Sequence, residues 1–124
     1  MSHHENISLL AYSPLAGGFL TGKYMNDNVP SNSRLSRVHS LFGRINENST
    51  LAVSVYVILA KKYQIDPVQM AVAFCNQRPF MGSVIFGATD NAQFKNILKG
   101  VDVMLSKEMM LEINKLYKRF PITF

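Results

Sequence analysis

The chain has 124 residues, of which 48% are hydrophobic, and a formal net charge of +5 from 13 Lys and Arg against 8 Asp and Glu. This length suits one domain or part of one (1–124), the apolar content excludes general disorder, and the dispersed cations argue against a nucleic-acid-binding module. A single cysteine excludes an intrachain disulfide, and no run approaches the ~20 apolar residues of a membrane helix. The start of the sequence lacks a signal-peptide pattern, so we expect a cytoplasmic protein.

The first predicted element is a strand. His3 and His4 precede it, but adjacent histidines project differently and no third ligand follows at useful spacing, so we predict an exposed end and no metal site. Ile7 to Tyr12 is an unbroken apolar run, which favours a short strand buried on both faces. The run breaks at Ser13-Pro14, and two glycines follow.

Tyr24 to Arg44 is a long polar segment with Pro30, several Asn and Ser residues, and no helical period. It is too long for a plain connection, so we predict a loop that either covers a ligand or is disordered. The segment carries Arg34, Arg37 and Arg44.

Two helices are predicted next. The first begins at a cap within residues 48–50 and runs to about Tyr63, and its apolar positions at helical spacing are Leu51, Val55, Ile58 and Leu59. Asp66-Pro67 has the cap-then-proline signature that starts a helix, which we place from Pro67 to about Asn76. One side of that helix carries Met70, Ala71, Phe74 and Cys75, which indicates a buried structural thiol.

A second strand, at residues 83–86, ends at Gly87. Thr89 or Asp90 then caps a helix of Asn91 to Lys99. Ser106 caps the last amphipathic helix, whose apolar positions include Leu111, Ile113, Leu116 and Tyr117, before an apolar tail of residues 120–124.

The two strand–turn–helix units follow the same logic. A buried strand followed by a turn of small residues can place backbone N–H groups where a phosphate sits. The Lys23 side chain could close over that anion. Plain connection chemistry explains each turn equally well, since many such loops bind nothing. If the strands are parallel, the two turns lie beside each other.

These residues resemble a known family. AYSPLAGGFLTGKY is similar to the turn after the seventh strand of an aldo-keto reductase, and SVIFGATDNAQFKNIL to the eighth strand and the helix that receives the adenosine end of NADP. RPF, GAT and VDVMLSKEMMLEINKL resemble the Tas-like bacterial branch, with the potassium-channel β-subunits as cousins. The resemblance runs over residues 5–118 but covers about the last third of the family's chain. It implies an α/β fold, the C-terminal part of a (β/α)8 TIM barrel with about two strands, and therefore an incomplete barrel.

The resemblance also implies roles for twelve residues. By this resemblance Tyr12 stacks on the nicotinamide ring, and the turn that follows wraps the pyrophosphate, mostly through backbone contacts. The turn residues are Ser13, Pro14, Leu15, Ala16 and Gly17. The cations in the belt over the phosphates are Lys23 and Arg34. The residues that meet the 2′-phosphate and the adenosine ribose are Gly87, Thr89 and Gln93, and Asn96 lies beside the adenine.

Two positions depart from the family. Ile97 stands where the family has an asparagine that hydrogen-bonds the adenine, and Asp90 places a negative charge near the expected 2′-phosphate. Each departure could cost about 1 kcal/mol of binding, so we expect NADP to bind weakly, or only in an assembled barrel.

The family's catalytic tyrosine, Lys, Asp and His all precede this segment, so no catalytic residue is predicted here. Two hypotheses remain. The chain is the C-terminal fragment of an NADP-dependent aldo-keto reductase that reduces carbonyls only when the rest is supplied, or it is an inactive oligomeric remnant or scaffold with weak or no nucleotide binding. Leaving four or five strand side chains in water costs on the order of 10 kcal/mol, so we expect self-association, docking to an upstream half-barrel polypeptide, or helices repacked around the strands.

Overall fold

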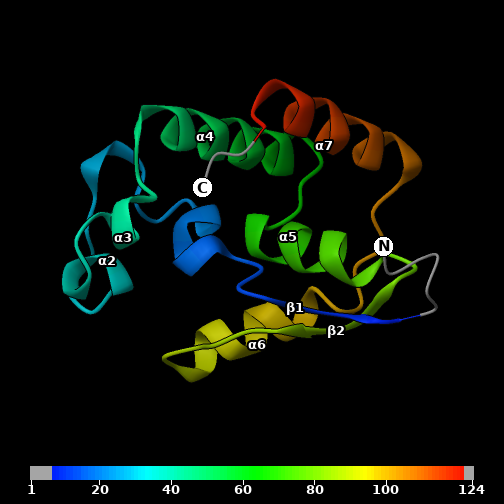
Figure 1. Cartoon of the computed structure of the whole chain (residues 1–124), viewed down its shortest axis with the longest axis horizontal. Helices are drawn as coiled ribbons and strands as arrows, with labels where there is room; N and C mark the ends of the chain where they lie inside the picture. The colour runs from blue at the N-terminus through cyan, green and yellow to red at the C-terminus, as the bar shows by residue number, and fades with distance from the viewer. Residues whose placement is uncertain (1–6, 122–124) are drawn as a thin grey trace.

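The structure is a computed structural model that describes residues 7–121, so the predictions for His3, His4 and residues 122–124 lie outside the described part. Figure 1 shows two parallel strands at the bottom of the molecule, α5 above them and α6 beside them, with α4 and α7 forming a layer on the far side of α5. Helix α5 is therefore the centre of the fold and contacts α4, α6, β2 and the first turn.

The elements have the following bounds. The strands are β1 (Leu9–Tyr12) and β2 (Met81–Ile85). The longer helices are α4 (Glu47–Lys62), α5 (Pro67–Asn76), α6 (Asn91–Lys99) and α7 (Lys107–Arg119). Short helical segments are η1 (Ala16–Thr21), η2 (Met25–Asp27), α2 (Arg34–Arg37) and α3 (Ser40–Gly43).

The strand pairing is parallel, and Tyr12 lies opposite Ile85. Burial of the first strand on both faces was a wrong prediction, because Leu10 and Tyr12 are 62% and 75% exposed. Ile85, opposite Tyr12 on β2, is 52% exposed. Alternate side chains of a strand point to opposite faces, and the helices cover one face only. Within residues 7–121 no third strand extends the pair, so its outer edges are unpaired, and the exposed side chains show that the other face is open. We call Leu10, Tyr12 and Ile85 the open sheet face.

The predicted caps of three helices are confirmed. The carboxylate of Asp66 accepts a hydrogen bond from the Val68 N–H at 2.8 Å, and Asp90 accepts one from Gln93 N–H at 2.8 Å. Ser106 caps α7 in the same way. The start of α4 differs: Asn46, not a residue of 48–50, is the cap, and it exchanges hydrogen bonds with Ser49 in a capping box.

The predicted apolar faces of two helices, α4 and α7, were only partly confirmed. Leu51 and Ile58 of α4 are exposed, and the residues buried along that helix are Ser49, Ala52, Val53, Val57, Leu59 and Ala60. Small side chains allow close approach of neighbouring elements, and most of the residues through which α4 packs are Ala and Val, with Leu59 as a larger one. On α7, Ile113 is buried as predicted, whereas Leu111 and Tyr117 are exposed.

Three clusters form the core. The cluster between α4, α5 and α7 consists of Leu59, Ala60, Met70, Ala73, Leu105, Met109 and Ile113. The cluster under the first turn consists of Phe19, Tyr24, Leu41, Val53 and Val57. The third, between α5 and α6, consists of Val68, Val72 and Ile97. Cys75 is half-buried rather than buried, and this burial raises the pKa of its thiol.

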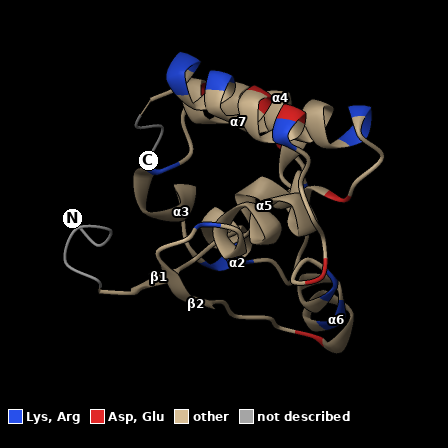
Figure 2. Cartoon of the chain, turned by 90° about the vertical axis from the view of Figure 1, so that its right-hand side faces the viewer, with Lys and Arg blue, Asp and Glu red and all other residues tan. Residues whose placement is uncertain are grey.

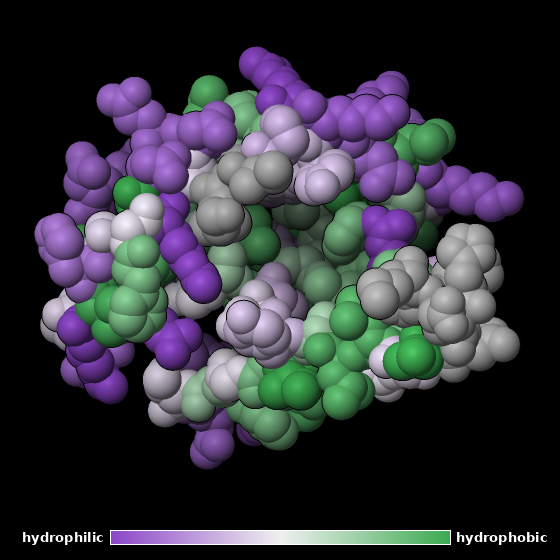
Figure 3. Space-filling model, viewed as in Figure 1, coloured by the Kyte–Doolittle hydropathy of each residue, from purple (hydrophilic) through white to green (hydrophobic). Residues whose placement is uncertain are grey.

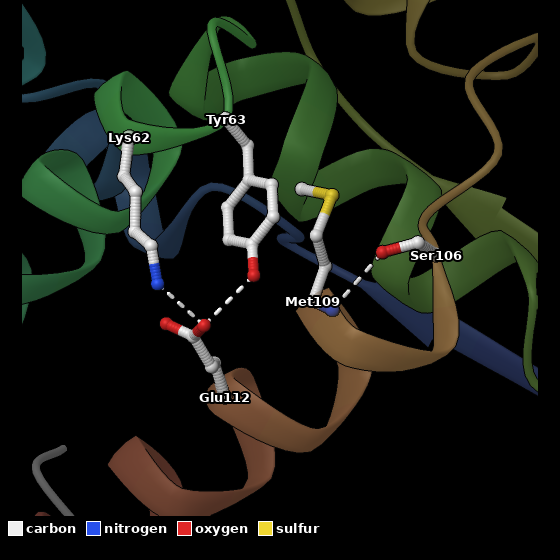
Figure 4. A network of polar contacts seen from close by, with 5 residues as sticks. All are labelled: Lys62, Tyr63, Ser106, Met109 and Glu112. Carbon is white, nitrogen blue, oxygen red and sulfur yellow. Dashed lines mark hydrogen bonds and ion pairs between the residues drawn. The ribbon is translucent and has the colours of Figure 1, made fainter.

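A polar contact joins the two outer helices (Figure 4). The carboxylate of Glu112 on α7 accepts hydrogen bonds from the Lys62 ammonium at 2.6 Å and from the Tyr63 hydroxyl at 2.7 Å. The hydrogen bond to Glu112 raises the pKa of Tyr63 to about 12, and the bond from Lys62 lowers the pKa of Glu112. The network therefore fastens the end of α4 to the middle of α7.

The segment of residues 24–44, predicted as a loop, contains η2, α2 and α3. It is attached to the core: Leu41 is 3% exposed, and the hydroxyl of Tyr24 accepts a hydrogen bond from the Leu35 N–H at 3.3 Å. The polar composition hid these contacts, because a few well-placed apolar residues are enough to hold a segment that has no helical period. Figure 2 shows that Lys and Arg are spread over the outer helices, α2 and α6. Within residues 7–121, no helix is long and apolar enough to cross a membrane.

Candidate functional site

A cavity of about 660 Å³ lies between the first turn, α2 and the corner that joins β2 to α6. Figure 3 shows an opening between the hydrophilic side of the molecule, over α2, and the apolar lower edge, over the strands. The lining residues are Ser13, Pro14, Leu15, Gly17, Gly18, Thr21, Lys23, Asn32, Ser33, Arg34, Arg37, Val38, Asp66, Val68, Phe86, Gly87, Ala88, Thr89, Gln93, Asn96 and Ile97.

The first wall begins at the end of β1, where Ser13 N–H donates to the Ile85 carbonyl at 3.1 Å and so joins the turn to the second strand. Gly17 and Gly18 have φ of 69° and 93°, a left-handed conformation that glycine adopts without strain. The turn binds to itself: Ala16 N–H donates to the Ser13 carbonyl at 3.0 Å and Gly18 N–H to the Leu15 carbonyl at 2.9 Å. These two amides are therefore already paired, unlike the free phosphate donors that the sequence suggested.

Three cations complete this wall. A Cβ built on Gly18 would lie 3.1 Å from the Lys23 Nζ, and one built on Gly17 would lie 3.7 Å from the Arg34 Cδ, so both side chains cover the glycine turn. Arg37 lies one turn further along α2 and also lines the cavity. The one ion pair between described residues is that of Lys62 with Glu112, so none of these three cations has a carboxylate partner within residues 7–121.

The second wall, at the corner between β2 and α6, has uncharged lining residues whose polar groups are largely hydrogen-bonded within the protein. Gln93 Oε1 accepts hydrogen bonds from the Thr89 hydroxyl at 3.1 Å and the Thr89 N–H at 3.3 Å. Asn96 Oδ1 accepts a hydrogen bond from Gln69 Nε2 at 2.7 Å, which fixes the amide and leaves its NH2 group for a ligand. A Cβ built on Gly87 would meet nothing within 4 Å, so this glycine leaves the cavity open.

An apolar floor joins the two walls. It consists of Val68, Phe86 and Ile97, with the Phe86 ring 5.9 Å from the ring of Phe94. Ile97 is 2% exposed and packs in the third core cluster, which explains why an isoleucine occupies this position. A flat, uncharged group between the two walls would contact this floor.

Ten of the twelve predicted residues line the cavity. Tyr12 and Ala16 do not, and Tyr12 lies on the open sheet face. Sequence reasoning missed the lining residues Gly18, Thr21, Asn32, Ser33, Arg37, Val38, Asp66, Val68, Phe86, Ala88 and Ile97. A signal existed for Arg37, because residues three apart share a helix face, but the segment was predicted as a loop.

The chemistry of the lining is that of binding. It offers three cations, amides, hydroxyls and an apolar floor, with Asp66 as its carboxylate, and that carboxylate already caps α5. Its members within residues 7–121 include no tyrosine, histidine, cysteine or glutamate. In the same described range no cluster of His, Cys, Asp or Glu could hold a metal ion.

Comparison with known proteins gives a consistent result. The model of the aldo/keto reductase family matches residues 1–118. The chain is 38% identical to the Protein tas of Escherichia coli over 95% of its length and 34% of that protein. It is 38% identical to a probable voltage-gated potassium channel subunit beta of Arabidopsis thaliana over 82% of its length and 32% of that protein.

Among solved structures, a glycerol dehydrogenase of Gluconobacter oxydans is similar with a TM-score of 0.68 and 24% identity, over 97% of this chain and 37% of that one. The chain thus spans about a third of the length of the curated relatives it matches. At this identity the solved structure supports the fold alone, and the two parallel strands agree with part of such an α/β fold. With a family model over nearly all of its sequence and relatives at 38% identity, the chain belongs to the aldo/keto reductase family.

Proposed function

We propose that this chain is the cofactor-binding part of an NADP-dependent aldo-keto reductase and that the cavity between its two corners holds the dinucleotide. The observation that carries the proposal is the cavity itself. Two segments about 70 residues apart in the sequence meet there. One carries three cations that have no carboxylate partner within the described residues 7–121, and the other carries amides and a glycine.

The lining fits the parts of such a cofactor. Lys23 and Arg34 suit the phosphates, because charge-assisted hydrogen bonds are stronger than neutral ones and a guanidinium can bind a phosphate in a bidentate manner. The apolar floor suits a flat ring, and the amides of Gln93 and Asn96 suit ribose and base. The nicotinamide, when bound, supplies the hydride that turns a carbonyl into an alcohol.

Proton transfer requires a further part of the protein. The described lining has no tyrosine or histidine that could donate a proton to the carbonyl oxygen as hydride adds to its carbon, and the chain corresponds to 34% of a curated relative. We therefore propose that carbonyl reduction needs the remaining strands of the barrel, supplied by an upstream half-barrel polypeptide. Such a polypeptide would cover the open sheet face, since Leu10, Tyr12 and Ile85 are at least half exposed.

The test is a titration of the chain with NADPH, followed by the fluorescence of the cofactor. Gly87→Val adds bulk where a Cβ meets nothing within 4 Å, so it should fill the cavity without disturbing the fold. We expect it to weaken binding about tenfold or more, about 1.4 kcal/mol. Ala92→Val is the matched control, because Ala92 is exposed on α6 and does not line the cavity.

The proposal fails if fluorescence does not change up to millimolar NADPH, or if Gly87→Val binds as tightly as Ala92→Val. Activity is measured separately with a panel of aldehydes, first on the chain alone and then after mixing it with an upstream half-barrel. We expect turnover only in the mixture.

The open sheet face also favours a second candidate, an oligomer without catalysis. Contiguous exposed apolar residues on a strand pair with free edges are a typical site of self-association. Sedimentation of the wild-type chain and of Leu10→Lys distinguishes the two states. An oligomer that dissociates on this substitution, together with no effect of NADPH, supports the scaffold.

A further inference from the structure

The short helix α2 is fixed to the core on one side and faces the cavity on the other. Leu35 packs against the cluster under the first turn, and its N–H donates to the Tyr24 hydroxyl at 3.3 Å. Ser33, 5% exposed, caps α2 by accepting a hydrogen bond from the Ser36 N–H at 3.3 Å. The position of α2 is therefore set by buried contacts and does not depend on a ligand.

This attachment places two guanidinium groups on one wall. Arg34 and Arg37 are three residues apart, a spacing at which side chains share a helix face. Both line the cavity and both remain exposed. An anion entering here would meet two forked donors beside the Lys23 ammonium, which lies 5.1 Å from the centre of the Tyr24 ring.

Several backbone donors around the cavity are already bonded within the protein. The N–H groups of Ala16 and Gly18 donate within the first turn. On the other side the Gln93 N–H donates to the Asp90 carboxylate, and the Thr89 N–H to the Gln93 side chain. The lining N–H groups of Leu15, Gly87 and Ala88 make no hydrogen bond within residues 7–121, so backbone donors can add to the binding of an anion. The positive charge of the described lining nevertheless comes from side chains, and these cations all belong to the first wall.

We infer that Arg37 binds the phosphate portion of the ligand directly, as a third cation beside Lys23 and Arg34. The inference rests on the proposed function in taking that ligand to be a dinucleotide. Arg37 is not among the residues that the family resemblance marks for the cofactor. Its role follows from the placement of α2 and from the absence of a carboxylate partner for Arg37 among residues 7–121.

The experiment compares Arg37→Gln with Arg44→Gln in the full chain. Arg44 is an exposed arginine of the same segment that does not line the cavity. Both variants therefore lose one positive charge, and they differ only in whether the lost charge lay at the cavity. By NADPH fluorescence we expect Arg37→Gln to bind about tenfold more weakly and Arg44→Gln within about twofold of wild type. Arg37→Lys should lie between them, since lysine keeps the charge but loses the fork. The difference should shrink at about 0.5 M salt, because screening weakens exposed ion pairs.

Equal affinity of Arg37→Gln and Arg44→Gln for NADPH overturns the inference while leaving the proposed function intact. If the wild-type chain does not bind NADPH, the proposed function fails, and inorganic pyrophosphate becomes the probe. A rise of the thermal midpoint with pyrophosphate in wild type and Arg44→Gln but not in Arg37→Gln upholds the phosphate role of Arg37. No rise in any of the three, or an equal rise in all three, overturns it.

Discussion

The two corners that enclose the cavity are built from the same ingredients and differ in charge. Each is an apolar strand, a glycine-containing turn and a helical segment. At the first corner the turn is hydrogen-bonded within itself, Lys23 and Arg34 cover it, and Arg37 lines the cavity beside it. At the second corner Asp90 caps the helix, and Thr89 and Gln93 hydrogen-bond each other. The cavity therefore has a positive end and a neutral end, which would orient a ligand that is charged on one side.

The largest expected effect removes the support of the first corner. Phe19 is 2% exposed and packs under the glycine turn against the core cluster that includes Val53 and Val57. Phe19→Ala should lower the free energy of unfolding by about 3–5 kcal/mol, because it removes a large buried side chain and leaves a cavity. Urea denaturation measures this, and the partly exposed Val29→Ala is the control. A loss below about 1 kcal/mol would show that the first corner does not depend on this packing.

A smaller effect tests how α6, the helix that follows the second corner, packs on α5. A Cβ built on Gly100 would lie 2.8 Å from the Val72 Cβ and 3.0 Å from the Gln69 Cα, so α6 approaches α5 as closely as it does because this residue has no side chain. Gly100→Ala should cost about 1–3 kcal/mol of stability through overpacking. Gly87→Ala is the matched control and should be neutral or slightly stabilising, since its Cβ would meet nothing and the unfolded chain loses freedom. Equal stability of both variants in a thermal melt would contradict this packing.

The difference in charge between the corners can be reduced by one substitution. Asp90→Asn should keep the helix cap, since Asn and Asp cap equally well, while removing the carboxylate beside the neutral wall. We expect NADPH to bind roughly twofold to fivefold more tightly, with stability nearly unchanged. Asp90→Ala should instead cost about 1 kcal/mol of stability through loss of the cap. Weaker NADPH binding by Asp90→Asn would mean that the carboxylate itself contacts the ligand.

Local signals in the sequence were sufficient for much of this architecture. Asp66-Pro67, Asp90 and Ser106 mark the starts of three helices because capping depends on a few neighbouring atoms. The adjacency of the two turns was expected from the strand–turn–helix pattern if the strands are parallel, which they are. The family resemblance named the twelve residues, ten of which line one cavity.

What the sequence did not reveal depends on distant contacts. Leu51 and Ile58 satisfy a helical apolar pattern and are exposed, because the neighbours that decide which face of α4 is buried come from other segments. Arg37 was overlooked because its helix has only four residues and is held by tertiary contacts such as that of Tyr24 with Leu35. Periodicity cannot detect an element of that length.

The smallest expected effect lies outside both corners. Glu112→Gln weakens the network between α4 and α7, and since this pair is near the surface it should lower the thermal midpoint by about 1–3 °C and leave NADPH binding unchanged. The raised pKa of Tyr63, about 12 against an ordinary 10.0, means that its contribution is present below pH 10.0 and is lost toward pH 12. The lowered pKa of Glu112 means that its contribution is present above pH 4.5 and is lost as the pH falls through the depressed value. The gap between wild type and Glu112→Gln should thus be widest between pH 4.5 and 10.0 and should close on both sides. A gap that does not vary with pH, or a change in cofactor affinity, would show that this network acts on the fold in another way.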